Sequence, residues 1–182
     1  MHSSFSLIRT KSRSHHGKVV RPGLRFLLGH VSHFFALGFG SGLAPFAPGT
    51  FGTLVAFPLF SLLNRRFEAT AQLVVLAVMY LAGIWFCERT GRDLGVEDHG
   101  SMVWDEIVAF MIVLFFTPRA LAWQVAAFLL FRFFDAAKPG PIRYIESRFR
   151  GGFGVMIDDL AAAFCTLLCL TLYTLLAKHF GG

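Results

Sequence analysis

The stretch Asp98–Glu106 reads DHGSMVWDE and separates two apolar segments of the chain. It places three carboxylates and one histidine within nine residues. Acidic groups beside hydrocarbon are costly unless they face the interior of a protein or a bound partner. The stretch therefore predicts a functional site between apolar helices rather than an ordinary solvent-exposed loop.

The composition of the whole chain is typical of a membrane protein. Of its 182 residues, 55% are hydrophobic, only 15% are charged and 22 are phenylalanine, and the formal net charge is +6. Soluble domains carry about 25% charged residues. The basic residues collect in the N-terminal tail and between apolar segments, which is typical of cytoplasmic loops and argues against a nucleic-acid-binding surface.

The order of polar and apolar segments predicts an all-α, polytopic membrane bundle with short or re-entrant helices. Residues 1–23 are expected to form a disordered, basic cytoplasmic tail, and residues 24–182 a single membrane domain. The segment Gly38–Gly52, GFGSGLAPFAPGTFG, predicts irregular backbone buried in protein, with a kinked connector as the alternative. The expected helices are the interfacial Leu24–Leu37, the short Thr53–Leu63, the span Thr70–Cys87, the pair Ile107–Phe116 and Leu121–Phe131, and the last span Leu160–Ala177.

The two middle segments are each shorter than the roughly 20 residues that a membrane span needs. They could form one long kinked helix or a hairpin of two short helices. Pro118 and Arg119 lie between them and favour the hairpin, because an arginine at the bilayer centre is costly. With the basic tail inside, the polar segments Glu88–Glu106 and Arg132–Asp159 then both face the cytoplasm.

Acidic residues come in adjacent pairs where two predicted apolar helices begin. These pairs are Asp105-Glu106 and Asp158-Asp159. Helix capping is one explanation, since acids in the first turn compensate the helix dipole. A single acid would suffice for that, whereas neighbouring carboxylates repel each other unless a cation lies between them. The pairs therefore predict a divalent metal site, and Mg²⁺ is usually held by one or two carboxylates plus substrate phosphate oxygens.

Other polar residues in the cytoplasm-facing segments suit phosphate binding. Arg132, Lys138 and Arg143 offer positive charge, while Thr50 and Ser101 offer hydroxyl or backbone donors. A local salt bridge is the alternative for Lys138, because Asp135 lies three residues before it. Gly151–Gly154 before the last predicted helix indicates either a tight turn or a close approach of the backbone to a phosphate.

Four of these stretches, in this order, resemble the bacterial phosphatidylglycerophosphatase A family, and the resemblance covers roughly residues 30–178. One departure is Gly140, where the family pattern has a large residue between two prolines. The matching stretches are GFGSGLAPFAPGTFGTL (Gly38–Leu54), DHGSMVWDE (Asp98–Glu106), FRFFDAAKP with PIR (Phe131–Arg143) and GGFGVMIDDL (Gly151–Leu160).

The resemblance implies a Mg²⁺-dependent lipid phosphatase of phospholipid biosynthesis. Such an enzyme removes the terminal phosphate of phosphatidylglycerophosphate to give phosphatidylglycerol. It would be a multi-pass protein of the bacterial inner membrane, with its active site facing the cytoplasm and with membrane lipids, not nucleic acid, as partners. The alternative is a small cation channel or transporter, which would also use acids and broken helices but would place charges within its spans.

A mechanistic hypothesis assigns roles to the residues of the four stretches. Phosphate is expected to bind Lys138, Arg143 and Arg132, with Thr50 and Ser101 as further donors. The expected catalytic residues are Asp105, Glu106, Asp135, Asp158 and Asp159, and the expected metal ligands are Asp105, Glu106, Asp158, Asp159 and Asp98.

Overall fold

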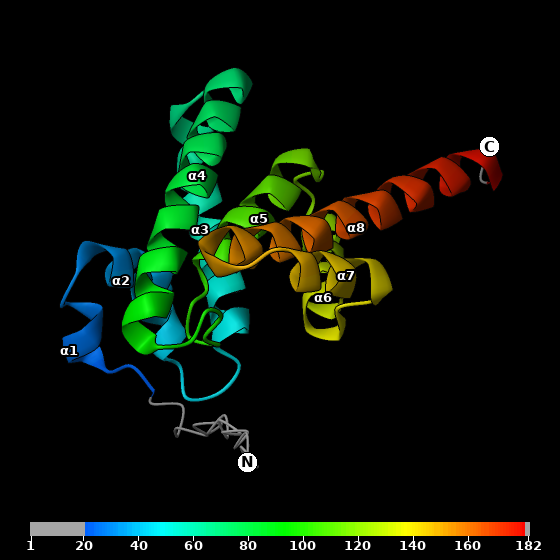
Figure 1. Ribbon diagram of the computed structural model, residues 1–182. Coiled ribbons are helices and arrows are strands. Elements are labelled where there is room, and N and C mark those ends of the chain that lie inside the picture. Colours follow the sequence, from blue (N-terminus) through cyan, green and yellow to red (C-terminus); the bar gives the residue numbers. More distant parts are fainter. Residues whose placement is uncertain (1–20, 181–182) are drawn as a thin grey trace, which may run out of the picture.

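The computed structural model describes residues 21–180, and this part of the chain is helical without any strand (Figure 1). The all-α prediction is thereby confirmed, while most of the predicted basic tail lies outside the described residues. The elements are α1 (Leu24–Leu27), α2 (Val31–Ala36), the 3₁₀ helix η1 (Gly38–Leu43), α3 (Pro48–Arg66), α4 (Ala69–Leu94), α5 (Trp104–Phe116), α6 (Leu121–Ala137), α7 (Gly140–Arg148) and α8 (Gly151–Phe180).

Helix α5 forms the centre of the bundle. After its acidic first turn it is apolar on all sides, and it packs against α3, α4, α6 and α8, as expected for a buried helix. The fully buried Phe110 illustrates this packing. Its ring centroid lies 5.2 Å from that of Phe57 on α3, and 5.9 Å and 5.4 Å from those of Phe128 and Phe131 on α6.

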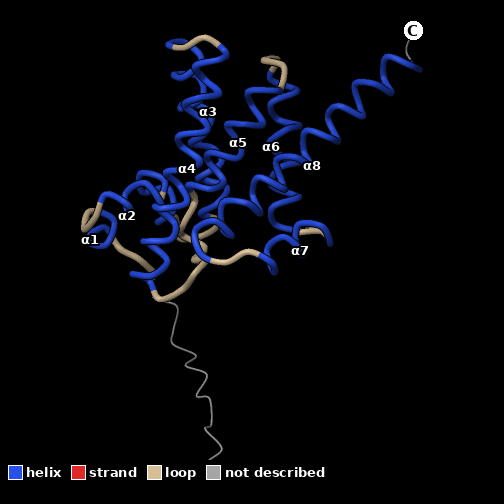
Figure 2. Tube along the Cα trace, turned by 45° about the horizontal axis from the view of Figure 1, so that its top comes forward, coloured by secondary structure: helices blue, strands red, loops and turns tan. Residues whose placement is uncertain are grey.

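Two helices, α4 and α8, are long and apolar enough to cross a membrane. Helix α8 has 30 residues and is therefore about 45 Å long, which exceeds the roughly 30 Å of bilayer hydrocarbon. Its C-terminal half projects away from the other helices (Figures 1 and 2). The exposed side chains there include Phe164, Leu168, Leu172 and Leu176, so this half of the helix presents the apolar surface that suits contact with lipid.

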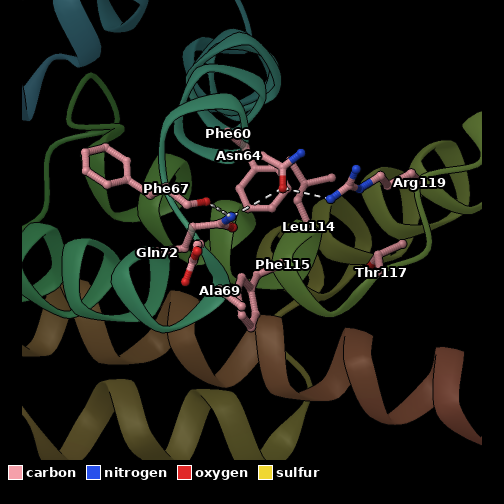
Figure 3. Close-up of a pocket in the computed structure, with 10 residues that line it drawn as sticks. Phe60, Asn64, Phe67, Ala69, Gln72, Leu114, Phe115, Thr117 and Arg119 are labelled. Carbon is pink, nitrogen blue, oxygen red and sulfur yellow. Dashed lines mark hydrogen bonds between the residues drawn. The ribbon is translucent and has the colours of Figure 1, made fainter.

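The turn between α3 and α4 meets the turn between α5 and α6 at one end of the bundle (Figure 2). Arg119 Nη2 donates a hydrogen bond of 2.9 Å to Asn64 Oδ1. The buried Gln72 donates to the same oxygen at 3.3 Å and to the carbonyl oxygen of Phe67 at 2.8 Å (Figure 3). These residues line a pocket of about 340 Å³, but their polar atoms bind each other and tie the two turns together. The predicted hairpin of short helices, α5 and α6, is confirmed.

We expect Gln72→Ala to lower the stability of the protein by about 1–3 kcal/mol, because it leaves the carbonyl of Phe67 without its donor. Arg119→Ala removes an exposed hydrogen bond of the same network and should lower the stability of the protein by less. Thermal unfolding in detergent, compared between the two variants, measures the difference. Equal and negligible shifts in both would show that this network does not stabilise the turns.

The helix that follows the glycine- and proline-rich segment begins earlier than predicted. Helix α3 starts at Pro48 rather than at Thr53, so the second part of the segment is helical. Proline at the first helical position has its φ angle pre-set and needs no intrahelical donor. Only the first part is irregular, with positive φ angles of 59° at Phe39, 104° at Gly40 and 45° at Ala47.

Two further boundaries differ from the prediction. Helix α4 continues to Leu94 rather than ending at Cys87, and the pair Glu88–Arg92, 2.6 Å apart at i,i+4 spacing, supports the added turns. Helix α8 starts at Gly151 rather than at Leu160. The single interfacial helix predicted near the N-terminus is instead the two short helices α1 and α2.

Candidate active site

The first pair of acids, Asp105 and Glu106, stands in the first turn of the central helix α5. Asp105 is buried, and the Glu106 side chain is only 14% exposed. The start of α3 presses against Glu106, because a Cβ atom on Gly49 would collide with its carboxylate. The Thr53 hydroxyl lies 3.3 Å from Glu106 Oε2. The predicted Thr50 makes no hydrogen bond to these acids within the described residues, and its neighbour Thr53, one turn further along α3, makes the contact instead.

The end of α6 brings two cations to the acids. Arg132 Nη1 lies 3.0 Å from Glu106 Oε2 on α5 and also binds Asp135 on its own helix. Lys138 Nζ lies 2.7 Å from Asp158 Oδ2 on α8. Lys138 ends α6 in the left-handed conformation, with φ of 40°, which is uncommon for a residue with a side chain. Lys138 thus forms an ion pair with another helix, α8, which its local spacing to Asp135 does not predict.

The second pair of acids lies deeper in its helix than predicted. Asp158 and Asp159 are both buried and stand two turns after the start of α8 at Gly151, not in its first turn. Because the helix dipole acts within the first turn, dipole compensation does not explain this pair. The apolar part that follows, Leu160–Phe180, still has the roughly 20 residues that a span requires. The acids therefore lie at one end of that apolar part.

The glycines at the start of α8 serve helix packing. A Cβ atom on Gly152 would collide with the carbonyl oxygen of Ile84 and lie 2.6 Å from the backbone nitrogen of Glu88, both on α4. The Glu88 carboxylate accepts a hydrogen bond of 2.6 Å from the Gly152 N–H. A carboxylate of the protein itself thus caps this helix at the Gly152 N–H. The positive φ angle of 66° at Gly151 fits the tight turn, which is one of the two alternatives for these glycines.

The two pairs of acids form one cluster. Asp159 lies close enough to other acids for their charges to repel one another. The acids concerned are Asp105, Asp135, Asp158 and Glu106. Within the described residues, one buried oxygen of Asp105 (Oδ1) and one of Asp159 (Oδ2) have no hydrogen-bond partner. Buried carboxylate oxygens without partners are costly, so these two atoms mark the place where a cation would be most stabilising.

The environment of Asp105 and Glu106 disfavours their charged forms. Burial, followed by repulsion from Glu106 and Asp98, raises the pKa of Asp105 well above its usual range. Burial also raises the pKa of Glu106 to about 7, although Arg132 and Thr53 partly oppose this. A bound divalent cation would restore the ionised forms, because opposite charge favours ionisation.

A pocket of about 400 Å³ opens beside the cluster and reaches Asp158. Asp98, which is exposed, is one of its walls, so this predicted ligand lies at the entrance rather than among the buried acids. Arg150, which the sequence reasoning did not single out, lines the same pocket. The full lining is Glu97, Asp98, Phe149, Arg150, Gly151, Gly154, Val155 and Asp158.

Two predicted phosphate-binding residues are not joined to the acid cluster by any contact among the described residues. Arg143 is exposed on α7. Ser101 is buried in the turn before α5. Its backbone N–H donates a hydrogen bond of 3.1 Å to His99 Nδ1. A residue that the sequence does not mark is Tyr80 of α4, whose buried hydroxyl has no hydrogen-bond partner among the described residues and lies within electrostatic range of Asp158.

The donor chemistry of the cluster fits a hard divalent cation such as Mg²⁺. Hard cations prefer carboxylate oxygens, and the unpaired oxygens of Asp105 and Asp159 belong to helices α5 and α8, which pack together. In residues 21–180, no three acidic, histidine or cysteine side chains are already set at ligand spacing. The fit therefore rests on the donor type and on these two oxygens.

All four sequence stretches that carry the family resemblance meet at this cluster. Gly49 comes from the first, Glu106 from the second, Lys138 from the third and Asp158 from the fourth. Residues 34–174 match the model of one protein family, described as Phosphatidylglycerophosphatase A. The chain belongs to the phosphatidylglycerophosphatase A family. It is accordingly a lipid phosphatase, as predicted.

Individual relatives support this family assignment. A phosphatidylglycerophosphatase A of Haemophilus influenzae is 49% identical over 133 residues, which cover 72% of this chain and 81% of the relative. A phosphatidylglycerophosphatase A of Escherichia coli is 41% identical over 139 residues, which cover 76% of this chain and 80% of the relative. A Bacteroides thetaiotaomicron protein, named provisionally as a phosphatidylinositol-3-phosphatase, is 44% identical over 134 residues, covering 69% and 82%. No solved structure shows a significant match to the chain.

Proposed function

We propose that this member of the phosphatidylglycerophosphatase A family removes the terminal phosphate of phosphatidylglycerophosphate in a Mg²⁺-dependent reaction. The observation that carries the proposal is the pair of buried oxygens on Asp105 and Asp159 that have no hydrogen-bond partner in the described part of the chain and lie near two cations. The names of the relatives from H. influenzae and E. coli support the choice of substrate.

The residues that would hold Mg²⁺ are Asp105 and Asp159, with Glu106 and Asp158 as further oxygen donors. The exposed Asp98 and the Arg132-bound Asp135 would complete or orient this set. When bound, a divalent cation polarises a phosphoryl oxygen and offsets the charge that develops on the leaving alkoxide.

The cations of the chain are placed to hold the phosphomonoester. Lys138 and Arg132 approach the cluster from α6, and each is held in position by carboxylates of a neighbouring helix. In the overall hydrolysis, the oxygen of a water molecule becomes bonded to phosphorus, the bond to the glycerol oxygen breaks, and the glycerol oxygen takes up a proton that the water gives up. Positive charge at the equatorial oxygens stabilises this transition state, and positioning supplies much of the remaining rate enhancement.

The arrangement also supports a multi-pass protein of the bacterial inner membrane whose site faces the cytoplasm. The acidic cluster lies at the starts of α3 and α5, at the end of α6 and two turns into α8. Asn64 in the last turn of α3 and Arg119 in the turn between α5 and α6 meet at the opposite ends of α3, α5 and α6. A cytoplasmic position of the cluster would give the site access to the leaflet in which the substrate is made.

Phosphate release by the purified protein tests the proposed function. In detergent micelles with Mg²⁺, the protein should release phosphate from phosphatidylglycerophosphate, lose this activity with a chelator and recover it when Mg²⁺ is restored. An activity that is unaffected by the chelator would contradict the metal dependence. Cation flux in liposomes without any phosphate release would favour the alternative of a channel.

A further inference from the structure

We propose that Arg150 binds the phosphodiester of the lipid substrate while the cations of the acidic cluster bind its phosphomonoester. This inference rests on the proposed function. The substrate carries two phosphoryl groups, one to be cleaved and one that links the headgroup glycerol to the diacylglycerol. The pocket beside the cluster offers a separate place for the second group.

The pocket runs along one face of α8 for two turns. Gly151, Gly154, Val155 and Asp158 line it at spacings of three and four residues, which places them in one row on the helix. The last residue lies seven positions after the first, so the row rises by about 10 Å along the helix axis. Asp158, with Lys138 bound to it, stands at one end of the row, and Arg150 directly precedes the other end.

The row is somewhat longer than the spacing of the two phosphoryl groups, so long side chains at its ends have to supply the contacts. Three carbons and two ester oxygens separate the two phosphorus atoms of the headgroup, and the long arginine side chain covers much of the remaining distance. A phosphomonoester held by Lys138 therefore leaves the phosphodiester within reach of Arg150.

The pocket combines one basic side chain, Arg150, with the carboxylates of Glu97, Asp98 and Asp158. Arg150 is exposed and forms no ion pair with any side chain that the structure describes. Its guanidinium has the planar geometry that binds phosphate oxygens in pairs. Glu97 and Asp98 line the same pocket, and their carboxylates can accept a hydrogen bond from the free hydroxyl of the glycerol between the phosphates. Glu97 Oε2 lies 3.5 Å from the backbone nitrogen of Gly151.

Aromatic rings mark the Arg150 end of the pocket as the side that faces lipid. Phe149 lines the pocket, and its ring centroid lies 5.2 Å from that of Phe153 in an edge-to-face contact. Both rings are exposed. Exposed apolar side chains that lie together in this way suit contact with lipid. The acyl chains would then leave the pocket past these rings, next to the phosphodiester that Arg150 binds.

Product inhibition separates the two ends of the pocket, because each product carries only one of the two phosphoryl groups. Short-chain phosphatidylglycerol contains the phosphodiester alone, and inorganic phosphate stands for the phosphomonoester alone. Arg150→Ala should weaken inhibition by phosphatidylglycerol about tenfold, as expected for loss of a charge-assisted hydrogen bond at an exposed site. It should raise KM for phosphatidylglycerophosphate by a similar factor, with kcat and inhibition by phosphate unchanged.

Three further variants sharpen this test. Arg148→Ala removes a neighbouring exposed arginine that does not line the pocket, and it should leave both inhibition constants unchanged. Arg150→Lys should recover only part of the affinity for phosphatidylglycerol, because lysine lacks paired donors. Lys138→Ala should instead weaken inhibition by inorganic phosphate.

The inference and the proposed function fail in different ways. Unchanged inhibition by phosphatidylglycerol and unchanged KM in Arg150→Ala, with an active wild-type protein, would overturn the role of Arg150 alone. An equal loss of affinity for phosphatidylglycerol in Arg148→Ala would also overturn it, because the effect would then come from general surface charge. A wild-type protein that releases no phosphate from this lipid would remove the proposed function and this inference with it.

Discussion

Asp159→Asn and Asp105→Asn are each expected to lower phosphate release at least about a hundredfold, since even the partners that orient metal ligands contribute 10- to 100-fold. Each substitution keeps the volume of the side chain but removes a charge and one oxygen. Both residues have a buried oxygen without a partner in the described part of the chain, so the loss is not explained by a broken hydrogen bond at that atom.

The stability of the same variants distinguishes a metal site from a structural role. Buried carboxylates that repel one another destabilise the metal-free protein, so neutralising one of them should keep or raise its unfolding temperature. Activity should therefore fall while metal-free stability does not. Glu68→Gln is the matched control, because it makes the same kind of change at the opposite end of the bundle. Near-normal rates in both cluster variants would contradict the assignment.

Gly152→Ala is expected to destabilise the protein strongly and to lower its activity. The added Cβ would collide with the backbone of Ile84 and Glu88, which cannot move aside as a flexible side chain can. Overpacking of this kind typically costs 1–3 kcal/mol or more. The first turns of α8 would have to move away from α4, and Asp158 and Asp159 lie on the turns that follow.

The control for this variant is Gly140→Ala, since a Cβ on Gly140 has no atom within 4 Å. Thermal unfolding and phosphate release should both be nearly unchanged in Gly140→Ala and both reduced in Gly152→Ala. Equal behaviour of the two variants would show that the close contact between α4 and α8 does not position the acids.

The sequence predicted the main features of the fold because they depend on local pattern. Low charge and long apolar runs predict α4 and α8, while Pro118 and Arg119 predict the hairpin of α5 and α6. The start of α8 was predicted nine residues too late, at Leu160 rather than at Gly151. Glycines favour turns locally, and here the packing against α4 and the cap from Glu88 override that preference.

The candidate site was predictable where chemistry is concentrated in the sequence. Adjacent acids are unusual in an apolar chain, and the structure brings both pairs together in one cluster. Contacts such as that of Thr53 with Glu106 depend on which helix faces meet, and no local pattern reports this. The expectation for Arg143 rests on its charge and on the family stretch that contains it, but Arg143 lies exposed on α7, while Arg150 lines the pocket.

Binding of Mn²⁺ in place of Mg²⁺ tests the central claim most directly, because it requires neither substrate nor catalysis. The measurement is a titration of the purified protein in detergent, with free Mn²⁺ followed by electron paramagnetic resonance. The wild-type protein should bind Mn²⁺ in competition with Mg²⁺, and a double variant of Asp105→Asn and Asp159→Asn should bind it at least about tenfold more weakly. Equal affinity in the wild-type protein and the double variant would show that these acids do not hold the cation.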